Sequence, residues 1–278
     1  MAEVVDTPLL VASDIDGTLV TTTDRVPARL RDAISRATAA GTEVALATGR
    51  PHRWIHEVLD QLTIRPVCVT SNGAVLYDSS SDRVLASHVV EPEVMAEVHD
   101  VATTALAEHG GVTIAAERVG VSSFDPPEDV FVVEPDYNHT WEEQGFGVLS
   151  TDEVLHMPAV KMILRNDSLT AAQMYALIRP HVDESHAHIT YSMNEGLLEV
   201  AAPGVTKALG VATLAEMHGV DRNRTIAFGD MPNDIEMLTW VSHGVAMANA
   251  ADPVKRVADE ITGTNNDAGV AQVLERWF

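Results

Sequence analysis

Short runs of apolar residues alternate with stretches of helical periodicity over the first part of the chain. In chain order the predicted elements are strand Leu9–Ala12, helix Ala28–Ala39, strand Val44–Ala47, helix Pro51–Leu62 and strand Val67–Val69. Strands that alternate with helices are typical of a parallel sheet with crossover helices. The next two apolar runs, Val75–Tyr77 and Val84–Val90, are joined by a polar segment and predict a hairpin.

Between Glu91 and Asn194 this alternation is lost. The patterns there predict helices at Val94–Ala107 and Ser168–Ile178 and strands at Val130–Val133, Val160–Leu164 and Ile189–Tyr191. Scattered strands with longer connections indicate an inserted α+β domain.

After Asn194 the α/β alternation returns. The predicted strands are Leu197–Ala201, Thr225–Phe228 and Gly244–Met247, and the predicted helices are Thr206–His218, Asp234–Trp240 and Val254–Ala258. The chain is therefore expected to have an α/β fold with a Rossmann-like parallel-sheet core, crossover helices and an inserted α+β domain. We expect the core to comprise residues 1–82 and 193–278, and the inserted domain to comprise residues 83–192.

Composition narrows the classes of partner. The chain has 278 residues, enough for two domains of about 100 to 200 residues each. Its 18 Lys and Arg residues against 41 Asp and Glu residues give a net charge of −23, which disfavours nucleic acids and anionic membranes as partners. The single cysteine, Cys68, excludes an intrachain disulfide and lies in an apolar run, as expected of a buried thiol.

The chain shows no targeting signal. Its first residues lack the basic and long apolar stretches of a signal peptide, and no run reaches the roughly 18 apolar residues of a membrane span. The expected location is therefore the cytoplasm, without a membrane partner.

The most informative polar segment is Asp14-Ile15-Asp16-Gly17-Thr18, which follows the first predicted strand. Two carboxylates at this spacing repel each other unless a cation or a shared proton offsets their charge. An EF-hand calcium loop is excluded, because it would need an acid in place of Thr18 and a glycine in place of Leu19.

Further polar clusters follow the other predicted strands. They are Thr48-Gly49-Arg50 after Val44–Ala47, Gly229-Asp230 and Asn233-Asp234 after Thr225–Phe228, and Lys207 at the start of the helix after Leu197–Ala201. Because the carboxyl ends of parallel strands meet at one edge of a sheet, we expect these residues to converge on a single site.

The residues expected at this site suit phosphoryl transfer. Asp14 is the candidate nucleophile, and Asp16 is placed to protonate the leaving alcohol and then to deprotonate water. The Thr48 hydroxyl, the backbone N–H groups near Gly49 and the charge of Lys207 are candidate partners of the phosphoryl oxygens. A solvated surface lysine is the alternative for Lys207.

The acidic residues also predict a metal site. Asp230 would join Asp14 and a backbone carbonyl near Asp16 around a hard cation, and ligands that are all oxygen favour Mg²⁺. Asp234 either orients a metal-bound water or Lys207, or stabilises the start of its helix as an N-terminal acid.

Two asparagines have two interpretations each. Asn233 either donates to the phosphate or serves as a helix cap. Asn72-Gly73 follows the third strand as either a hairpin turn or part of the site, and the turn is slightly favoured.

Taken together, the motifs resemble those of the haloacid dehalogenase-like hydrolases, specifically the Cof-type sugar-phosphatase branch with a large cap domain inserted after the second motif. The segments that carry the resemblance are Asp14–Thr18, Ala47–Arg50, Ser71–Ala74, Lys207, Gly229–Asp234 and Val245–Ala250. They span the core, whereas the inserted domain matches only in position and length. Met231-Pro232 departs from the smaller or polar residues common in that loop of the family.

The resemblance implies a Mg²⁺-dependent phosphomonoesterase that works through an aspartyl-phosphate. Asp14 would be the nucleophile and Asp16 the acid/base, with Thr48, Gly49, Lys207 and Asn233 at the phosphate and Arg50 assisting substrate binding. The metal site would comprise Asp14, Asp16, Asp230 and Asp234. The expected substrate is a small phosphorylated metabolite, such as a sugar phosphate, and the expected state is a monomer or homodimer.

Two other functions fit the same motifs. A phosphomutase would need a second phosphate-binding cluster in the inserted domain, where the basic residues are few: Arg118, Lys161, Arg165 and Arg179. A catalytically silent phosphate-binding or regulatory protein would need a broken catalytic position, and every catalytic position is intact. The alcohol part of the substrate does not follow from the core motifs, because one fold serves many activities.

Overall fold

The chain folds into two compact units. The structure, a computed structural model, describes residues 6–138 and 145–278. The first unit combines the chain up to Leu85 with Thr206–Phe278, and the second is Ala86–Val205. The boundaries between the units lie after Leu85 and after Val205, whereas the sequence predicted them after residues 82 and 192. The second difference arises because Leu197–Ala201 is a strand of the second unit.

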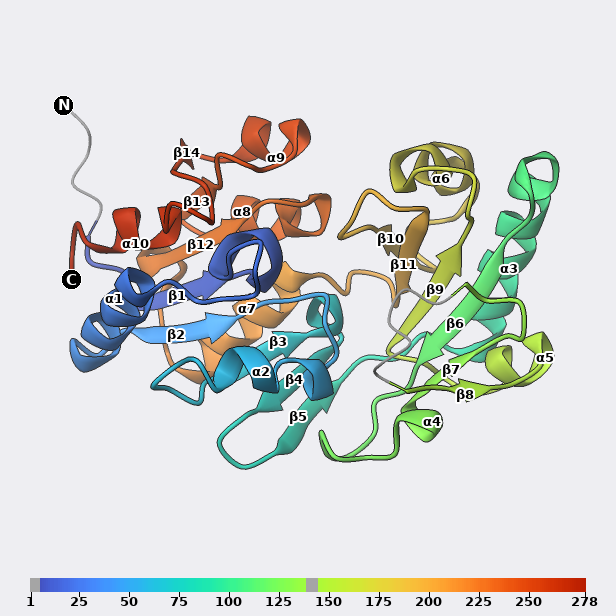
Figure 1. The fold of residues 1–278 in the computed structure, drawn as a ribbon, viewed down its shortest axis with the longest axis horizontal. Helices are drawn as coiled ribbons and strands as arrows, with labels where there is room; N and C mark the ends of the chain where they lie inside the picture. The colour runs from blue at the N-terminus through green and yellow to red at the C-terminus, as the bar shows by residue number, and fades with distance from the viewer. Residues whose placement is uncertain (1–5, 139–144) are drawn as a thin grey trace. The chain divides into compact units, whose positions relative to one another are not determined.

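The first unit is built on a five-stranded parallel sheet in the order β14-β13-β12-β1-β2 (Figure 1). Its strands are β1 (Leu10–Ser13), β2 (Glu43–Leu46), β12 (Thr225–Gly229), β13 (His243–Ala246) and β14 (Glu260–Ile261). β1 lies between β12 and β2, so residues that follow β1 and β12 leave the sheet side by side. The predicted parallel-sheet core is confirmed.

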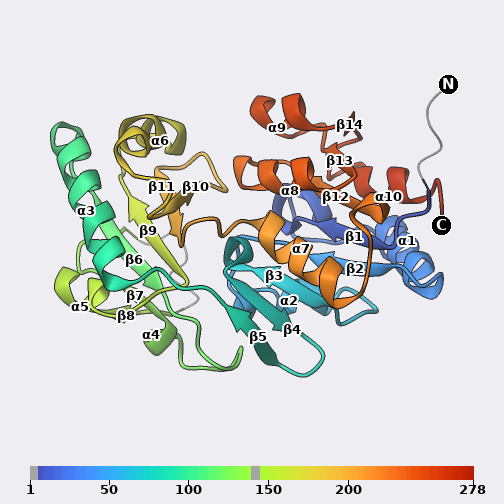
Figure 2. The same cartoon turned by 180° about the vertical axis from the view of Figure 1, so that it is seen from behind.

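Helices cover both faces of this sheet. They are α1 (Ala28–Ala39), α2 (His56–Leu59), α7 (Lys207–Met217), α8 (Ile235–Trp240), α9 (Asp252–Val257) and α10 (Gly269–Leu274). α7 and α8 pack against each other on one face, whereas α1 and α10 pack together on the other (Figures 1 and 2). Within the described residues, no helix of either unit has the length and apolar character needed to cross a membrane.

The third predicted strand leads into a small separate sheet. β3 (Val67–Thr70), β4 (Val75–Asp78) and β5 (Arg83–Ser87) form a three-stranded sheet in that order, which confirms the predicted hairpin. An isolated parallel bridge between Ala47 and Val69 joins this sheet to the edge of the five-stranded one.

The helix predicted over Pro51–Leu62 is wrong in length. The segment forms a short 3₁₀ turn, His52–Trp54, followed by α2, which has only four residues. Side chains bind the carbonyl groups that a longer helix would use: Arg65 donates to Leu59 O over 2.7 Å, and Gln61 Nε2 donates to Glu57 O over 3.1 Å. The apolar periodicity of the segment does not reveal these competing hydrogen bonds.

The second unit has the predicted α+β composition. Its six-stranded sheet has the order β10-β11-β9-β6-β7-β8 and is antiparallel except between β7 and β8. The strands are β6 (Thr113–Glu117), β7 (Phe131–Val133), β8 (Gly147–Val148), β9 (Lys161–Arg165), β10 (His188–Thr190) and β11 (Leu197–Ala201). The helices are α3 (Pro92–Leu106), α4 (Pro127–Val130), α5 (Thr151–Leu155) and α6 (Ala171–Ile178).

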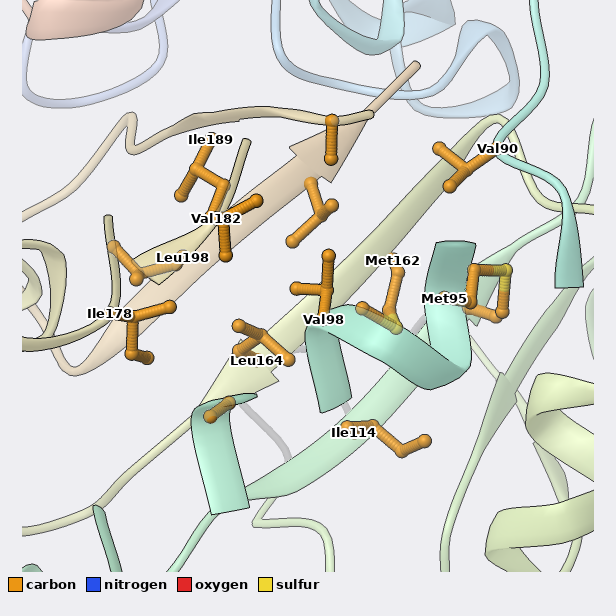
Figure 3. Close-up of a cluster of buried hydrophobic side chains, with 14 of the residues drawn as sticks. Val90, Met95, Val98, Ile114, Met162, Leu164, Ile178, Val182, Ile189 and Leu198 are labelled. Atoms are coloured by element: carbon orange, nitrogen blue, oxygen red, sulfur yellow. The ribbon is translucent and has the colours of Figure 1, made fainter. Parts of the chain in front are cut away.

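A buried apolar cluster joins the helices of the second unit to its sheet. Figure 3 shows Met95 and Val98 of α3 and Ile178 of α6 gathered around Met162 and Leu164 of β9. All five side chains are fully buried. Because side chains alternate across a strand, the intervening residue of β9 belongs to a second apolar cluster.

The structure corrects the assignment of Leu197–Ala201 to the parallel core. This strand, β11, pairs antiparallel with β9 and β10 in the second unit. All five of its residues are buried, Glu199 among them, and a strand that is buried on both faces fits an interior position of either sheet. Lys207 therefore does not follow a core strand, although α7, which it opens, belongs to the first unit.

Candidate active site

Asp14 and Lys207 form a buried ion pair in the first unit. Asp14 follows β1 directly, and its backbone N–H donates to Phe228 O over 3.0 Å. Nζ of Lys207 lies 2.6 Å from Asp14 Oδ1 and 2.6 Å from Asp234 Oδ1, with the lysine side chain fully buried. The alternative of a solvated surface lysine is therefore wrong.

Three carboxylates meet at this lysine. One oxygen from each of Asp14, Asp230 and Asp234 lies within 4.8 Å of the others, and all three residues are buried. Burial raises the pKa of Asp230 to about 7, and the nearby Asp234 carboxylate adds to this rise, although a hydrogen bond from Thr18 Oγ1 opposes it. Burial also raises the pKa of Asp14 well above its ordinary value, against the opposing charge of Lys207. Three acidic groups beside one ammonium group create an excess of negative charge that a cation would neutralise.

The donor set of this cluster fits a hard divalent cation. The three clustered groups offer only carboxylate oxygens, which are the ligands that Mg²⁺ takes in proteins. Thr18 Oγ1 donates to Asp230 Oδ1 over 2.8 Å and thereby fixes the orientation of that carboxylate. The Asp16 side chain is not part of the acidic cluster found among the described residues.

Asp16 instead pairs with Arg50. Arg50 Nε lies 2.8 Å from Asp16 Oδ2, and its Nη2 lies 2.5 Å from Asp16 Oδ1, so the pair is bidentate. The hydrogen bond to Asp16 raises the pKa of the Arg50 guanidinium, in opposition to its partial burial. The Asp16 side chain is 54% exposed, unlike the three clustered aspartates.

Asp234 orients Lys207, one of the roles left open by the sequence, but its side chain makes no capping hydrogen bond to α8, the helix that follows it. Its Oδ1 accepts from Lys207, and its Oδ2 accepts from the backbone N–H groups of Asp230 at 2.9 Å and Met231 at 3.0 Å. The carboxylate therefore stabilises the start of the turn Pro232–Asp234 and orients the lysine at the same time.

The loop after β2 carries Thr48, Gly49 and Arg50, and Arg50 reaches the loop after β1 through its pair with Asp16. Thr48 is fully buried, and its Oγ1 accepts from the backbone N–H of Arg50 over 3.0 Å. Because Thr48 Oγ1 accepts this hydrogen bond, the hydroxyl proton of Thr48 is not used in it and can be donated to another group. Gly49 lies between the two residues in the same loop.

Gly17 permits the close approach of Asp230 to the loop after β1. Its φ of +75° lies in the left-handed region, and a Cβ atom there would lie 2.2 Å from Asp230 Oδ2. Only glycine suits both the backbone conformation and this contact.

Sequence reasoning did not assign roles to Thr18 and Asn249. Asn249 Nδ2 donates to Gly17 O over 2.8 Å and so holds the loop that carries Asp14 and Asp16. Asn249 belongs to one of the segments that carried the family resemblance, which was the only signal for it. Its partner lies 232 positions away in the sequence.

Asn233 is buried and bonded to Asn72. Its Nδ2 lies 3.0 Å from Asn72 Oδ1, so the turn after β3 meets the loop after β12. Asn72 is therefore more than an isolated hairpin turn.

The structure thus places a buried lysine among three aspartates, two of which directly follow parallel strands. Comparison with known proteins supports the family expected from the motifs. The model of the haloacid dehalogenase-like hydrolase family matches residues 11–274. Two proteins of Bacillus subtilis, each named 5-amino-6-(5-phospho-D-ribitylamino)uracil phosphatase, are similar over nearly their whole length. YitU is 28% identical, with 98% of both chains covered, and YcsE is 29% identical, with 96% of this chain and 95% of YcsE covered.

A solved structure shares the fold. It is a haloacid dehalogenase-like hydrolase from Bacteroides thetaiotaomicron, 26% identical, with a TM-score of 0.73 and coverage of 98% of this chain and 100% of that one. The chain belongs to the haloacid dehalogenase-like hydrolase family, which confirms the resemblance drawn from its motifs. The names of the relatives support the predicted class of enzyme, a phosphoric monoester hydrolase.

Proposed function

We propose that this protein is a Mg²⁺-dependent phosphatase that hydrolyses small phosphomonoesters through an aspartyl-phosphate on Asp14. The observation that carries the proposal is the contact of Lys207 Nζ with Asp14 Oδ1 at 2.6 Å beside two further buried aspartates. This contact holds one carboxylate oxygen of Asp14, and the other oxygen remains for attack on phosphorus.

The charge of the transferred phosphoryl group is met by fixed donors. Lys207 supplies a full positive charge, and the buried Thr48 hydroxyl and the Asn233 amide supply N–H or O–H donors. Asp14 and Asp230 would hold Mg²⁺ together with a backbone carbonyl near Asp16, with Asp234 in support. When bound, the ion neutralises the carboxylates and the phosphoryl oxygens.

Asp16 is the proposed acid and base. It would give a proton to the leaving alcohol and then take one from the water that attacks the phosphoenzyme. Both of its oxygens accept hydrogen bonds from Arg50 in this structure. The Arg50 pair therefore has to open before Asp16 carries a proton, and the freed Arg50 becomes available for the substrate, the role expected from the sequence.

The proposed substrate is a small phosphorylated metabolite with a sugar or sugar-alcohol group. The two Bacillus relatives are named for a phosphoribityl compound, which is a phosphomonoester of this kind. The residues of the first unit described above are suited to binding the phosphate. We therefore propose that the second unit acts as an inserted cap domain and determines which alcohol the enzyme accepts. Cytoplasmic location and a monomeric or homodimeric state stay predictions, which cell fractionation and size-exclusion chromatography test.

The basic residues of the second unit favour hydrolysis over a phosphomutase reaction. All four are engaged within that unit: Arg118 with the carbonyls of Val154 and Pro158, Lys161 with Glu199, Arg165 with Asp167, and Arg179 with Glu184. A mutase would need such residues grouped around a second phosphate.

A phosphate-release screen tests the proposed function. The panel contains sugar phosphates, phosphoglycolate, nucleotides, pyridoxal phosphate and an aryl phosphate, with Mg²⁺ and with EDTA. We expect steady phosphate release that stops on chelation and needs no bisphosphate activator. Interconversion of hexose 1- and 6-phosphates with little free phosphate would instead identify a mutase.

A further inference from the structure

The turn after β3 has an unfavourable backbone conformation. Ser71 and Asn72 are consecutive residues other than glycine with φ of 49° and 57°, and Gly73 follows with φ of 98°. Such left-handed conformations are costly for residues with a side chain and persist where the surroundings enforce them. Asparagine is among the residues that tolerate them best, but Ser71 has no such advantage.

Neighbouring parts of the first unit's site hold this turn in place. The backbone N–H of Ser71 donates to Arg50 O, and that of Asn72 donates to Thr48 O, each over 3.0 Å. Gly73 packs so closely on the start of α7 that a Cβ atom there would lie 2.0 Å from Thr206 O, next to Lys207. The turn thus contacts two segments that carry predicted phosphate-binding groups.

The side chain of Asn72 reaches a third such group. Its Oδ1 accepts from Asn233 Nδ2 over 3.0 Å, and the two residues are 3% and 4% exposed. This bond uses one of the two amide protons of Asn233 and fixes the direction of the other. Within the part of the chain that the structure describes, Asn233 Oδ1 and the neighbouring Ser71 Oγ are buried without a hydrogen-bond partner. Of the two atoms, the Ser71 hydroxyl can donate to an anionic ligand such as phosphate, whereas Asn233 Oδ1 is an acceptor and needs a donor group.

We propose that Asn72 is a positioning residue for phosphate binding, which orients the Asn233 amide so that its second proton points to a phosphoryl oxygen. The inference rests on the proposed phosphatase function and adds a residue to which the family motifs assign no role. A plain hairpin turn would need only a residue that tolerates positive φ, whereas the positioning role needs the acceptor oxygen of Asn72.

Two substitutions separate these roles. Asn72→Gly keeps a backbone that accepts a φ of 57° but removes the acceptor, and Asn72→Ala removes the acceptor and also strains the turn. We expect both variants to lose about tenfold in kcat/KM for an aryl phosphate and to bind inorganic phosphate about tenfold more weakly as a competitive inhibitor. Both variants lose the buried hydrogen bond, and Asn72→Ala should have the lower unfolding midpoint of the two because it also strains the turn.

Asp82→Gly is the matched control. Asp82 also has a positive φ, of 50°, and lies at the opposite end of β4. Its Oδ1 accepts a partly buried hydrogen bond from Tyr77 Oη over 2.7 Å. We expect this variant to keep the wild-type affinity for inorganic phosphate. A double-mutant cycle adds the mechanism: in an Asn233→Ala background, Asn72→Gly should change neither constant further.

The outcomes are distinct from failure of the proposed function. If the wild type releases phosphate with Mg²⁺ and Asp14→Asn does not, the proposed function stands, and the Asn72 variants test the inference alone. Wild-type phosphate affinity and kcat/KM in Asn72→Gly, with losses confined to Asn72→Ala, would reduce Asn72 to a turn residue and overturn the inference. Losses in Asn72→Gly that persist in full without Asn233 would overturn it as well.

Discussion

Lys207 Nζ donates to Asp14 Oδ1 and Asp234 Oδ1 at equal distances of 2.6 Å, although Asp14 and Lys207 are 193 positions apart in the sequence. The lysine thus links the loop after β1, which carries Asp14, to the loop after β12, which carries Asp234. Burial of the ammonium group lowers its pKa, but the opposing charge of Asp14 and then of Asp234 outweighs this and keeps it charged.

Removal of this charge should affect both stability and turnover. In Lys207→Met, two buried carboxylates lose their cation, so we expect a loss of about 3–5 kcal/mol in the free energy of unfolding together with loss of phosphate release. Denaturant unfolding and a phosphatase assay measure the two effects. Lys255→Met on α9 is the control and should leave both unchanged. Equal stability of the two variants would mean that the buried ion pair does not support the fold.

Asp230 should destabilise the metal-free protein at alkaline pH. Its folded pKa is raised to about 7 from an ordinary value of 3.8, so its contribution to stability is present at low pH and lost as the pH rises through about 7. We therefore expect metal-free Asp230→Asn to be more stable than the wild type at about pH 8, and the difference to vanish near pH 4.

The same variant tests the metal site. Mg²⁺ should raise the unfolding midpoint of the wild type but not that of Asp230→Asn, because a ligand that binds the folded state stabilises it. If Mg²⁺ raised the unfolding midpoint of both proteins equally, Asp230 would not be a ligand of the metal. This conclusion does not depend on the outcome of the comparison at alkaline pH.

Gly17→Ala should weaken metal binding, and the chain offers a matched control. Gly17 and Gly204 have φ of +75° and +73°, but a Cβ atom on Gly204 would meet nothing within 4 Å, whereas on Gly17 it would displace Asp230. Both substitutions strain the backbone by about 1–2 kcal/mol, because a side chain then occupies the left-handed region. Only Gly17→Ala should raise the Mg²⁺ concentration for half-maximal activity, by about tenfold or more. The same Mg²⁺ requirement in both variants would show that the Gly17 contact is unimportant for the site.

The sequence predicted that Asp14 and Asp230 lie close together, because this convergence depends only on where each residue follows its strand. Asp14 and Asp230 follow apolar runs directly, and the ends of adjacent parallel strands meet by geometry alone. Lys207 lies at the site as predicted, but it does not follow a strand of the parallel sheet, because β11 belongs to the other sheet. The sequence of a strand that is buried on both faces does not reveal which sheet the strand joins.

Long-range side-chain contacts were beyond the reach of the sequence. Nothing in the local pattern shows that Arg50 holds both oxygens of Asp16, or that Asn249 holds the Gly17 carbonyl. The short α2 has a similar explanation, because the Arg65 side chain competes for the carbonyl groups that would extend it. These features depend on which polar groups meet in three dimensions.

If Asp14 carries the phosphoryl group during turnover, the phosphorylated enzyme can be trapped and the modified residue identified. Wild-type enzyme is mixed with an aryl phosphate and Mg²⁺, quenched in acid during the first turnover, and digested for mass spectrometry. We expect phosphate on the peptide that contains Asp14, at the Asp14 carboxylate, and none in Asp14→Asn. Phosphate on another side chain, or an active Asp14→Asn enzyme, would contradict this role of Asp14.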